Sequence, residues 1–138
     1  MKKPNKVLID SSILIAAAIS ERGAARDLLR RGFRGDLDLS LSSIVLEESE
    51  RNLRLKAPEA LAAFCAFREM LAVHVIDPPA NLVSSVARIV ELKDSPIVAA
   101  AVEAGAAYLA TYDRKHLLRL KQEIEAHFTV IVVTPDEI

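Results

Sequence analysis

Residues 6–18 have the sequence KVLIDSSILIAAA, and this stretch indicates how the chain begins to fold. Its first part, Lys6–Ile9, is a short apolar run, which is typical of a strand buried in a parallel sheet. The polar segment Asp10–Ser12 follows, and a serine of this segment can cap the helix that the next apolar residues predict. A buried strand that leads through a polar turn into a helix is typical of the start of a βα unit.

The same alternation of strands and helices is predicted for the rest of the chain. Helices are expected between the strands, and a short basic helix is expected to begin at Asp113. Further strands are expected at residues 37–41, 73–76, 108–111 and 128–133. This order predicts an α/β fold, a three-layer α/β/α sandwich with a central, mostly parallel sheet of about five strands. Because no linker, internal repeat or low-complexity segment interrupts the pattern, residues 1–138 are expected to form a single domain.

The composition is typical of a globular domain, with 51% hydrophobic and 27% charged residues. The single cysteine, Cys65, excludes an internal disulfide and is expected to be a small buried core residue, because it lies in an apolar run. No uninterrupted apolar run reaches the ~20 residues that span a bilayer, and Asp10–Ser12 interrupt the N-terminal one. A cytoplasmic location without membrane contact is therefore expected.

Four acidic residues are expected near the carboxyl ends of strands, where open α/β sheets bind their ligands. Asp10 follows the first strand, Glu48 lies in the helix after the second, Asp94 opens a later helix, and Asp113 follows the strand at 108–111. Taken singly, each aspartate can be a helix cap and Glu48 a solvated surface residue. Taken together, clustered carboxylates repel one another unless a cation compensates, and ligand sets made of oxygen suit Mg²⁺ or Mn²⁺.

Several other chemistries find no support in the sequence. The three histidines, His74, His116 and His127, are isolated and lack zinc-type spacing. No phosphate-binding glycine loop and no GxSxG element is present. A phosphoryl-transfer domain of the response-receiver or haloacid-dehalogenase type also has an aspartate after its first strand. It remains an alternative, although the dehalogenase pattern requires a second aspartate where Ser12 stands.

Four segments in order resemble the PIN-domain family, and together they span nearly the whole chain. The segments are VLIDSSILIAA at residues 7–17, SSIVLEESERNL at 42–53, KDSPIVAAAVEAGAAYLATYDRKHLL at 93–118 and TPDEI at 134–138. This resemblance implies a PIN-like fold and a Mg²⁺- or Mn²⁺-dependent endoribonuclease that hydrolyses RNA phosphodiester bonds. Many small members of the family are VapC-type toxins of toxin–antitoxin pairs, so RNA, an antitoxin protein and a second copy of the chain are the candidate partners.

The resemblance also implies which residues form the site. The catalytic and metal-binding residues are expected to be Asp10, Glu48, Asp94 and Asp113, with Glu47 as the alternative to Glu48. Ser12 and Thr111 are expected to support the acidic residues, although many relatives carry Asn at the position of Ser12. His116 stands where some relatives carry a further acid, which puts a fifth carboxylate ligand in doubt.

RNA contacts are expected from basic residues that flank the acidic site, since the net charge of −1 does not indicate a general affinity for nucleic acid. Arg114 and Lys115 directly follow Asp113 and are the first candidates for contact with phosphate groups. A second candidate is the helix face formed by Arg26, Arg30 and Arg34, which is otherwise a solvated surface. The alternative function is a catalytically silent PIN-fold module that binds RNA or protein.

Overall fold

The computed structural model of the chain describes residues 3–138. Its strands are β1 (Asn5–Ile9), β2 (Leu37–Ser40), β3 (Tyr108–Ala110) and β4 (Ile131–Val133). Its α-helices are α1 (Ser11–Ile19), α2 (Ala24–Phe33), α3 (Ser43–Lys56), α4 (Leu61–Leu71), α5 (Ala80–Val86), α6 (Ser95–Glu103) and α7 (Lys121–Phe128). Short 3₁₀ helices are η1 (Pro58–Ala60), η2 (Ala72–His74), η3 (Leu92–Asp94) and η4 (Pro135–Glu137).

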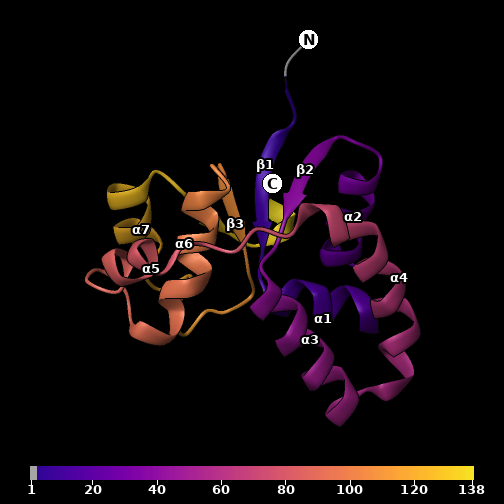
Figure 1. The fold of residues 1–138 in the computed structure, drawn as a ribbon. Coiled ribbons are helices and arrows are strands. Elements are labelled where there is room, and N and C mark those ends of the chain that lie inside the picture. The colour runs from indigo at the N-terminus through magenta and orange to yellow at the C-terminus, as the bar shows by residue number, and fades with distance from the viewer. Residues whose placement is uncertain (1–2) are drawn as a thin grey trace.

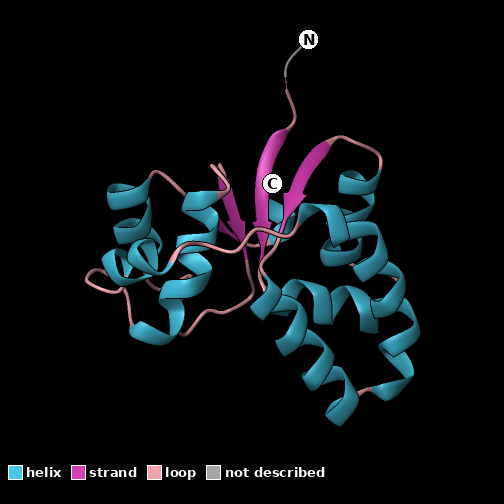
Figure 2. Cartoon of the chain, viewed as in Figure 1, coloured by secondary structure: helices cyan, strands magenta, loops and turns pink. Residues whose placement is uncertain are grey.

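The four strands form one parallel sheet in the order β2-β1-β3-β4 (Figures 1 and 2). In this sheet Val7 of β1 lies opposite Leu39 of β2 and Tyr108 of β3. Since all the strands run in one direction, their carboxyl ends share one edge of the sheet. The predicted α/β sandwich with a parallel central sheet is confirmed.

Each face of the sheet is covered by helices from one continuous part of the chain. Helices α1 to α4 lie on one side and α5 to α7 on the other (Figure 1). Val7 and Ile9 pack into the apolar core on the first side, and Leu8 packs into the core on the second side. Full burial of such side chains contributes about 1.5–3 kcal/mol each, so β1 ties both layers of helices to the sheet.

The strand predicted at residues 73–76 is reduced to a single parallel bridge between Val75 and Leu41. The preceding residues, Ala72–His74, form η2, and two backbone hydrogen bonds join this segment to Leu41. Pro78 and Pro79 follow within a few residues and have no N–H groups to donate to a longer ladder. The sheet of the described residues therefore has four strands.

The helix predicted to begin at Asp113 is also absent, because residues 114–120 form turns and the next helix begins at Lys121. The Asp113 carboxylate accepts a hydrogen bond from the His116 N–H at 3.1 Å, and the Asp113 carbonyl accepts one from the Leu118 N–H at 2.9 Å. A bond that spans five residues is wider than the α-helical repeat. These two bonds hold the segment in a turn.

Cys65 is exposed on α4, so the expectation that it is a small buried core residue is wrong. The buried face of that helix is formed by Phe64, Phe67 and Leu71, and Cys65 lies beside this face.

No helix within residues 3–138 combines the length and the apolar character needed to cross a membrane.

The arginines of the proposed basic stripe on α2 make contacts within the fold. Arg26 donates from Nε to the Ala17 carbonyl at 2.7 Å, and its guanidinium lies 4.9 Å from the centre of the Phe67 ring. Arg30 donates to the Glu21 carbonyl at 3.1 Å. Arg34 forms an ion pair with its near neighbour Asp36. The half-buried Arg26 thus joins α1, α2 and α4, and its role is to stabilise the packing of these helices.

We expect Arg26→Ala to lower the free energy of unfolding by about 2 kcal/mol, because it removes a charged hydrogen bond and a cation–π contact. The matched control is Arg30→Ala on the same helix face, which is exposed and should cost less than about 0.5 kcal/mol. Urea unfolding of both variants measures the difference. Equal losses would contradict the bridging role of Arg26.

Candidate active site

All four predicted acidic residues line one cavity of about 300 Å³, called the acid cavity below, at the carboxyl edge of the sheet. Asp10 follows β1, Glu48 lies on α3, Asp94 ends η3, and Asp113 follows β3. The sequence separations are large, so only the fold brings these side chains to a common cavity. The predicted convergence of four carboxylates from four segments is what the geometry displays.

The cavity lies where the chain changes direction across the sheet. From β1 the chain passes to β2 on one side of it, and it later returns to β3 on the other side. The segments after β1 and β3 therefore diverge and leave a crevice, which is the usual ligand site of open α/β sheets. Asp10 stands at this point, and its backbone N–H donates to the Ala110 carbonyl of β3 at 3.1 Å.

Two hydroxyl groups hold the Asp10 carboxylate. Thr111 Oγ1 donates to Asp10 Oδ2 at 2.8 Å, and Ser12 Oγ donates to the same oxygen at 3.0 Å. Each hydroxyl also accepts a backbone N–H, from Asp113 to Thr111 and from Tyr112 to Ser12, both at 3.0 Å. The network fixes Asp10 relative to the segment after β3, and among the described residues no side chain donates to Asp10 Oδ1.

Capping does not account for the positions of Asp10 and Asp94. Both occupy the N-cap position of a helix, α1 and α6 respectively, yet neither side chain makes a capping hydrogen bond. Asp113 differs, because its Oδ1 caps the turn that contains His116. The alternative interpretation of Asp10 and Asp94 as helix caps is therefore not supported by their hydrogen bonds.

The structure separates Glu48 from its neighbour Glu47. Glu48 lines the cavity, and its Oε2 accepts a hydrogen bond from Ser11 Oγ at 3.3 Å. Both glutamates are exposed, but Glu47 lies outside the residues that line the cavity. From the sequence, Ser11 was expected to cap a helix or to bond to Asp10, and its bond to Glu48 was missed because a contact across 37 residues gives no local signal.

Asp94 is the most buried of the four acids, with 8% of its surface exposed. Its Oδ2 has no hydrogen-bond partner among the described residues. Burial raises the pKa of this carboxyl group, and the charges of Asp113 and Glu91 add to the shift, while His116 and Lys93 oppose it. A buried carboxylate oxygen without a partner costs free energy, so this group is destabilising unless a ligand binds to it.

A contact between Lys93 and His116 was missed by the sequence analysis. Each ring nitrogen of His116 makes a contact. Nδ1 lies 3.2 Å from both carboxylate oxygens of Asp113, and Nε2 lies 2.7 Å from Lys93 Nζ. Both residues line the acid cavity. The histidine that looks isolated in the sequence is therefore part of the candidate site.

The donor set fits a hydrated divalent cation better than a fully enclosed one. Within residues 3–138 no three His, Cys, Asp or Glu side chains are grouped closely enough to hold a metal ion by themselves. Mg²⁺ usually keeps several waters and binds through one or two carboxylates together with substrate phosphates. The unpartnered Asp94 Oδ2 and the other carboxylates of the cavity could serve as these ligands, directly or through water.

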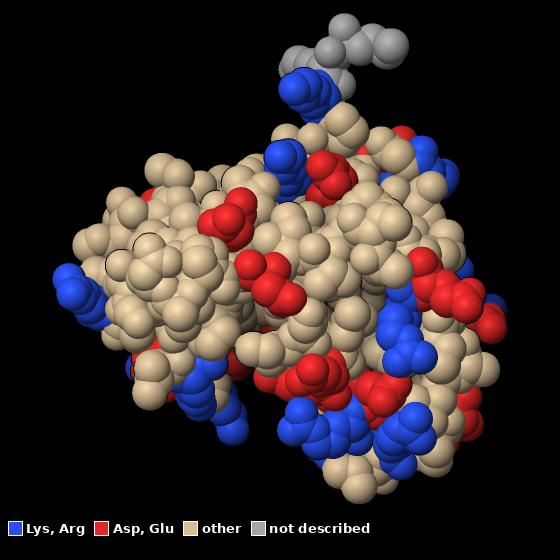
Figure 3. Space-filling view, in the orientation of Figure 1, with Lys and Arg blue, Asp and Glu red and all other residues tan. Residues whose placement is uncertain are grey.

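Arg114 and Lys115 are exposed in the turn after Asp113 and do not belong to the residues that line the cavity. Arg114 lies near Asp136, whose pKa is lowered mainly by a hydrogen bond from Thr134 and to a lesser degree by the arginine. Figure 3 shows acidic side chains at the lower edge of the molecule with basic side chains on both sides of them.

Two solved structures are similar to this chain over almost their whole length. PAE2754 from Pyrobaculum aerophilum is 25% identical, with a TM-score of 0.57, and the match covers 94% of this chain and 92% of that one. FitAcB from Neisseria gonorrhoeae is 17% identical, with a TM-score of 0.63, and the match covers 96% and 99%. No protein-family model and no curated protein matches the sequence. The chain has a PIN-like α/β fold, as the resemblance of its acidic segments predicted.

We expect Thr111→Val to destabilise the fold by about 1–3 kcal/mol, because the Asp113 N–H loses its acceptor at a buried position. The same variant removes one of the two hydroxyl groups that hold Asp10, so the affinity of the protein for Mn²⁺ should fall by about 10–100-fold. Thr111→Ser keeps the hydroxyl and loses one methyl group, so it should cost about 1 kcal/mol and keep the metal affinity. Urea unfolding and calorimetric titration with Mn²⁺ test both effects; equal metal affinities in the two variants would remove Thr111 from a positioning role.

We expect Asp94→Asn to stabilise the metal-free protein at neutral pH. The pKa of Asp94 is raised in the folded state, so ionisation of the wild type costs stability as the pH rises from the ordinary aspartate pKa of 3.8 through the folded pKa. The asparagine has no such loss, and the two proteins should differ little at lower pH. Urea unfolding in EDTA across this pH range measures the difference.

Added metal should reverse the order of stability. Mn²⁺ at 100 times its dissociation constant should stabilise the wild type by about 2.7 kcal/mol and the Asp94→Asn protein by much less. A variant that is less stable than the wild type in EDTA at pH 7, or that gains as much from Mn²⁺, would argue against Asp94 as a strained metal ligand.

Proposed function

We propose that this chain is a divalent-metal-dependent endoribonuclease that hydrolyses RNA phosphodiester bonds. The observation that carries the proposal is the single cavity lined by Asp10, Glu48, Asp94 and Asp113. Four carboxylates around one cavity repel one another, and a bound cation is the natural compensation. The PIN-like fold and the resemblance of the acidic segments to PIN nucleases support the same activity.

Asp10, Glu48, Asp94 and Asp113 would hold one or more Mg²⁺ or Mn²⁺ ions, which supply a water of lowered pKa and neutralise charge on the phosphate group. The residues behind them orient the ligands. Ser12 and Thr111 hold Asp10, Ser11 holds Glu48, and His116 contacts Asp113. Such supporting hydrogen bonds set the orientation and basicity of metal ligands.

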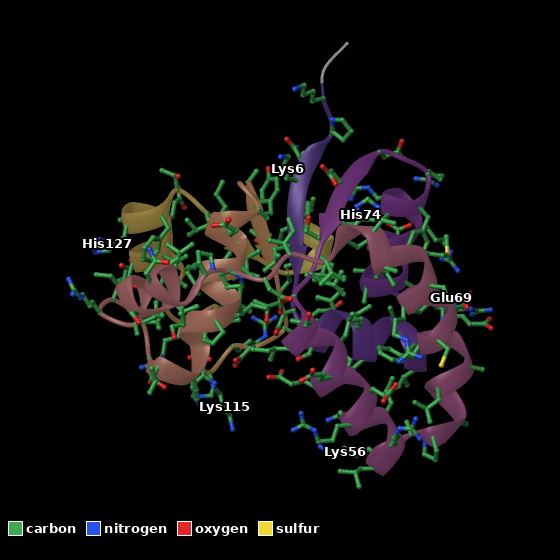
Figure 4. All side chains as sticks on the ribbon, viewed as in Figure 1. Lys6, Lys56, Glu69, His74, Lys115 and His127 are labelled. Atoms are coloured by element: carbon green, nitrogen blue, oxygen red, sulfur yellow. The ribbon has the colours of Figure 1, made fainter. Side chains whose placement is uncertain are left out.

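RNA also needs cations outside the acidic cavity, because its own charge is repelled there. A surface hollow of about 280 Å³ shares Glu48 with the cavity and contains Arg51 and Lys56. Figure 4 shows Lys56 at the lower end of α3 and Lys115 at the lower edge on the opposite side. We propose Arg114 and Lys115 as phosphate contacts on that side. Arg51 and Lys56 are the corresponding candidates for phosphate contact on α3.

We propose further that the nuclease is the toxin of a toxin–antitoxin pair, with an antitoxin protein and a second copy of the chain as partners. The resemblance to VapC-type toxins supports this role. Exposed apolar side chains are available for protein contacts, among them Leu55, Val73 and Leu92, which are 78%, 87% and 76% exposed. A bound antitoxin protein would limit the activity of the nuclease in the cell.

We expect the purified protein to cleave a mixture of single-stranded and structured RNAs in Mn²⁺, and EDTA to abolish the cleavage. Glu48→Gln should lower the single-turnover rate by at least about 10–100-fold, because a ligand should matter at least as much as its supporting contacts. Glu47→Gln removes the same charge one residue away and should keep the wild-type rate. Asp10→Asn serves as the second inactive variant. Denaturing gels of end-labelled RNA measure the rates.

Each outcome of this experiment has a different meaning. Cleavage that persists in EDTA or in Glu48→Gln would refute the proposed site, and loss in Glu47→Gln alone would move the ligand to Glu47. A folded, Mn²⁺-binding protein that cleaves no RNA would favour the catalytically silent binding module. Covalent labelling of Asp10 by a small phosphodonor would favour the phosphoryl-transfer alternative instead.

A further inference from the structure

The wall of the acid cavity includes one lysine among the acidic residues. Among the described residues that line the cavity, Lys93 is the single lysine or arginine. Its neighbours in the cavity include Asp94 and Asp113, yet Lys93 forms no ion pair with a carboxylate of the described residues. Its charge acts on Asp94 without a direct ion pair, so the ammonium hydrogens are not taken up by a carboxylate and can bind another anion.

His116 holds the lysine in this position. An ammonium group has only hydrogens to donate, so His116 Nε2, 2.7 Å from Lys93 Nζ, must be the acceptor. The ring hydrogen is then on Nδ1 and is donated to Asp113, whose oxygens lie at 3.2 Å. The contact uses one of the three ammonium hydrogens and leaves two, together with the positive charge. The imidazole thus separates Lys93 from Asp113 while it fixes both.

We propose that Lys93, held by His116, is a phosphate-binding subsite of the acid cavity and contacts the phosphate group that lies at the acidic residues when RNA binds. This inference rests on the proposed nuclease function. Four carboxylates repel a phosphate group, and a lysine on the same wall supplies the attraction that brings it there. An ammonium group binds phosphate as a point charge, and the two free N–H groups suit its non-bridging oxygens.

The first experiment measures the binding of a short fluorescent single-stranded RNA in EDTA, where no metal-dependent cleavage occurs. Lys93→Gln should weaken binding and lower the slope of log K against log salt by about 0.7, the value for one phosphate contact on a single strand. Lys93→Arg keeps the charge and should keep the slope. Lys6→Gln is the matched control, because Lys6 is an exposed lysine of β1 at the opposite edge of the sheet (Figure 4).

The second experiment identifies the phosphate group. A series of the same RNA carries one uncharged methylphosphonate linkage at each position in turn. The wild type should lose affinity for the linkage that meets Lys93, and Lys93→Gln should lose no further affinity there, since the two changes remove one interaction. His116→Gln removes the holding contact and should weaken binding in the wild type but not in the Lys93→Gln background.

These results separate the subsite from the nuclease. Unchanged affinity and salt slope in Lys93→Gln, or losses that add at every linkage, would overturn the phosphate subsite whether or not the protein cleaves RNA. Binding that depends on Lys93 in a protein that never cleaves RNA would support the subsite and refute the nuclease proposal. If cleavage occurs, the phosphodiester linkage that contacts Lys93 should be the one that is cut.

Discussion

The parallel pairing of β1 with β3 brings together two segments that are separated by most of the chain, and the acid cavity depends on it. Asp10 and Thr111 are 101 residues apart, yet a 2.8 Å hydrogen bond joins them at the end of these strands. The register puts Ile9 opposite Ala110, so the next residues of both strands meet. A shift of one residue would turn each side chain to the other face and separate the hydroxyl groups from the carboxylate.

The cavity is costly to the fold in which it lies. Asp94 is buried with an unpartnered oxygen, and its neighbours in the cavity carry the same charge. The apolar cores on both faces of the sheet offset this cost, because Val7, Leu8 and Ile9 are all fully buried. The unfavourable burial of the Asp94 oxygen lies in the cavity at the carboxyl edge of the sheet, where a ligand can relieve it.

Periodicity and turn residues predicted the order of strands and helices along the chain, because these elements depend on short-range patterns of apolar residues. Val75 was assigned to a strand, but whether an apolar segment extends a sheet depends on its neighbours in space. The Arg26 stripe was placed on the surface, since a helical repeat cannot indicate that a carbonyl of another helix faces it. The contact of Lys93 with His116 across 23 residues was likewise invisible. The four acids were proposed from their places relative to the strands and helices and from the resemblance to PIN domains.

The arrangement of the helices has a consequence for how the protein is made. The part of the chain up to α4 can cover one face of the sheet while the ribosome is still adding the rest. Two of the four acids, Asp10 and Glu48, belong to this first part, and Asp94 and Asp113 emerge later. The cavity therefore has all four carboxylates only after β3 inserts beside β1, which requires most of the chain to have been synthesised.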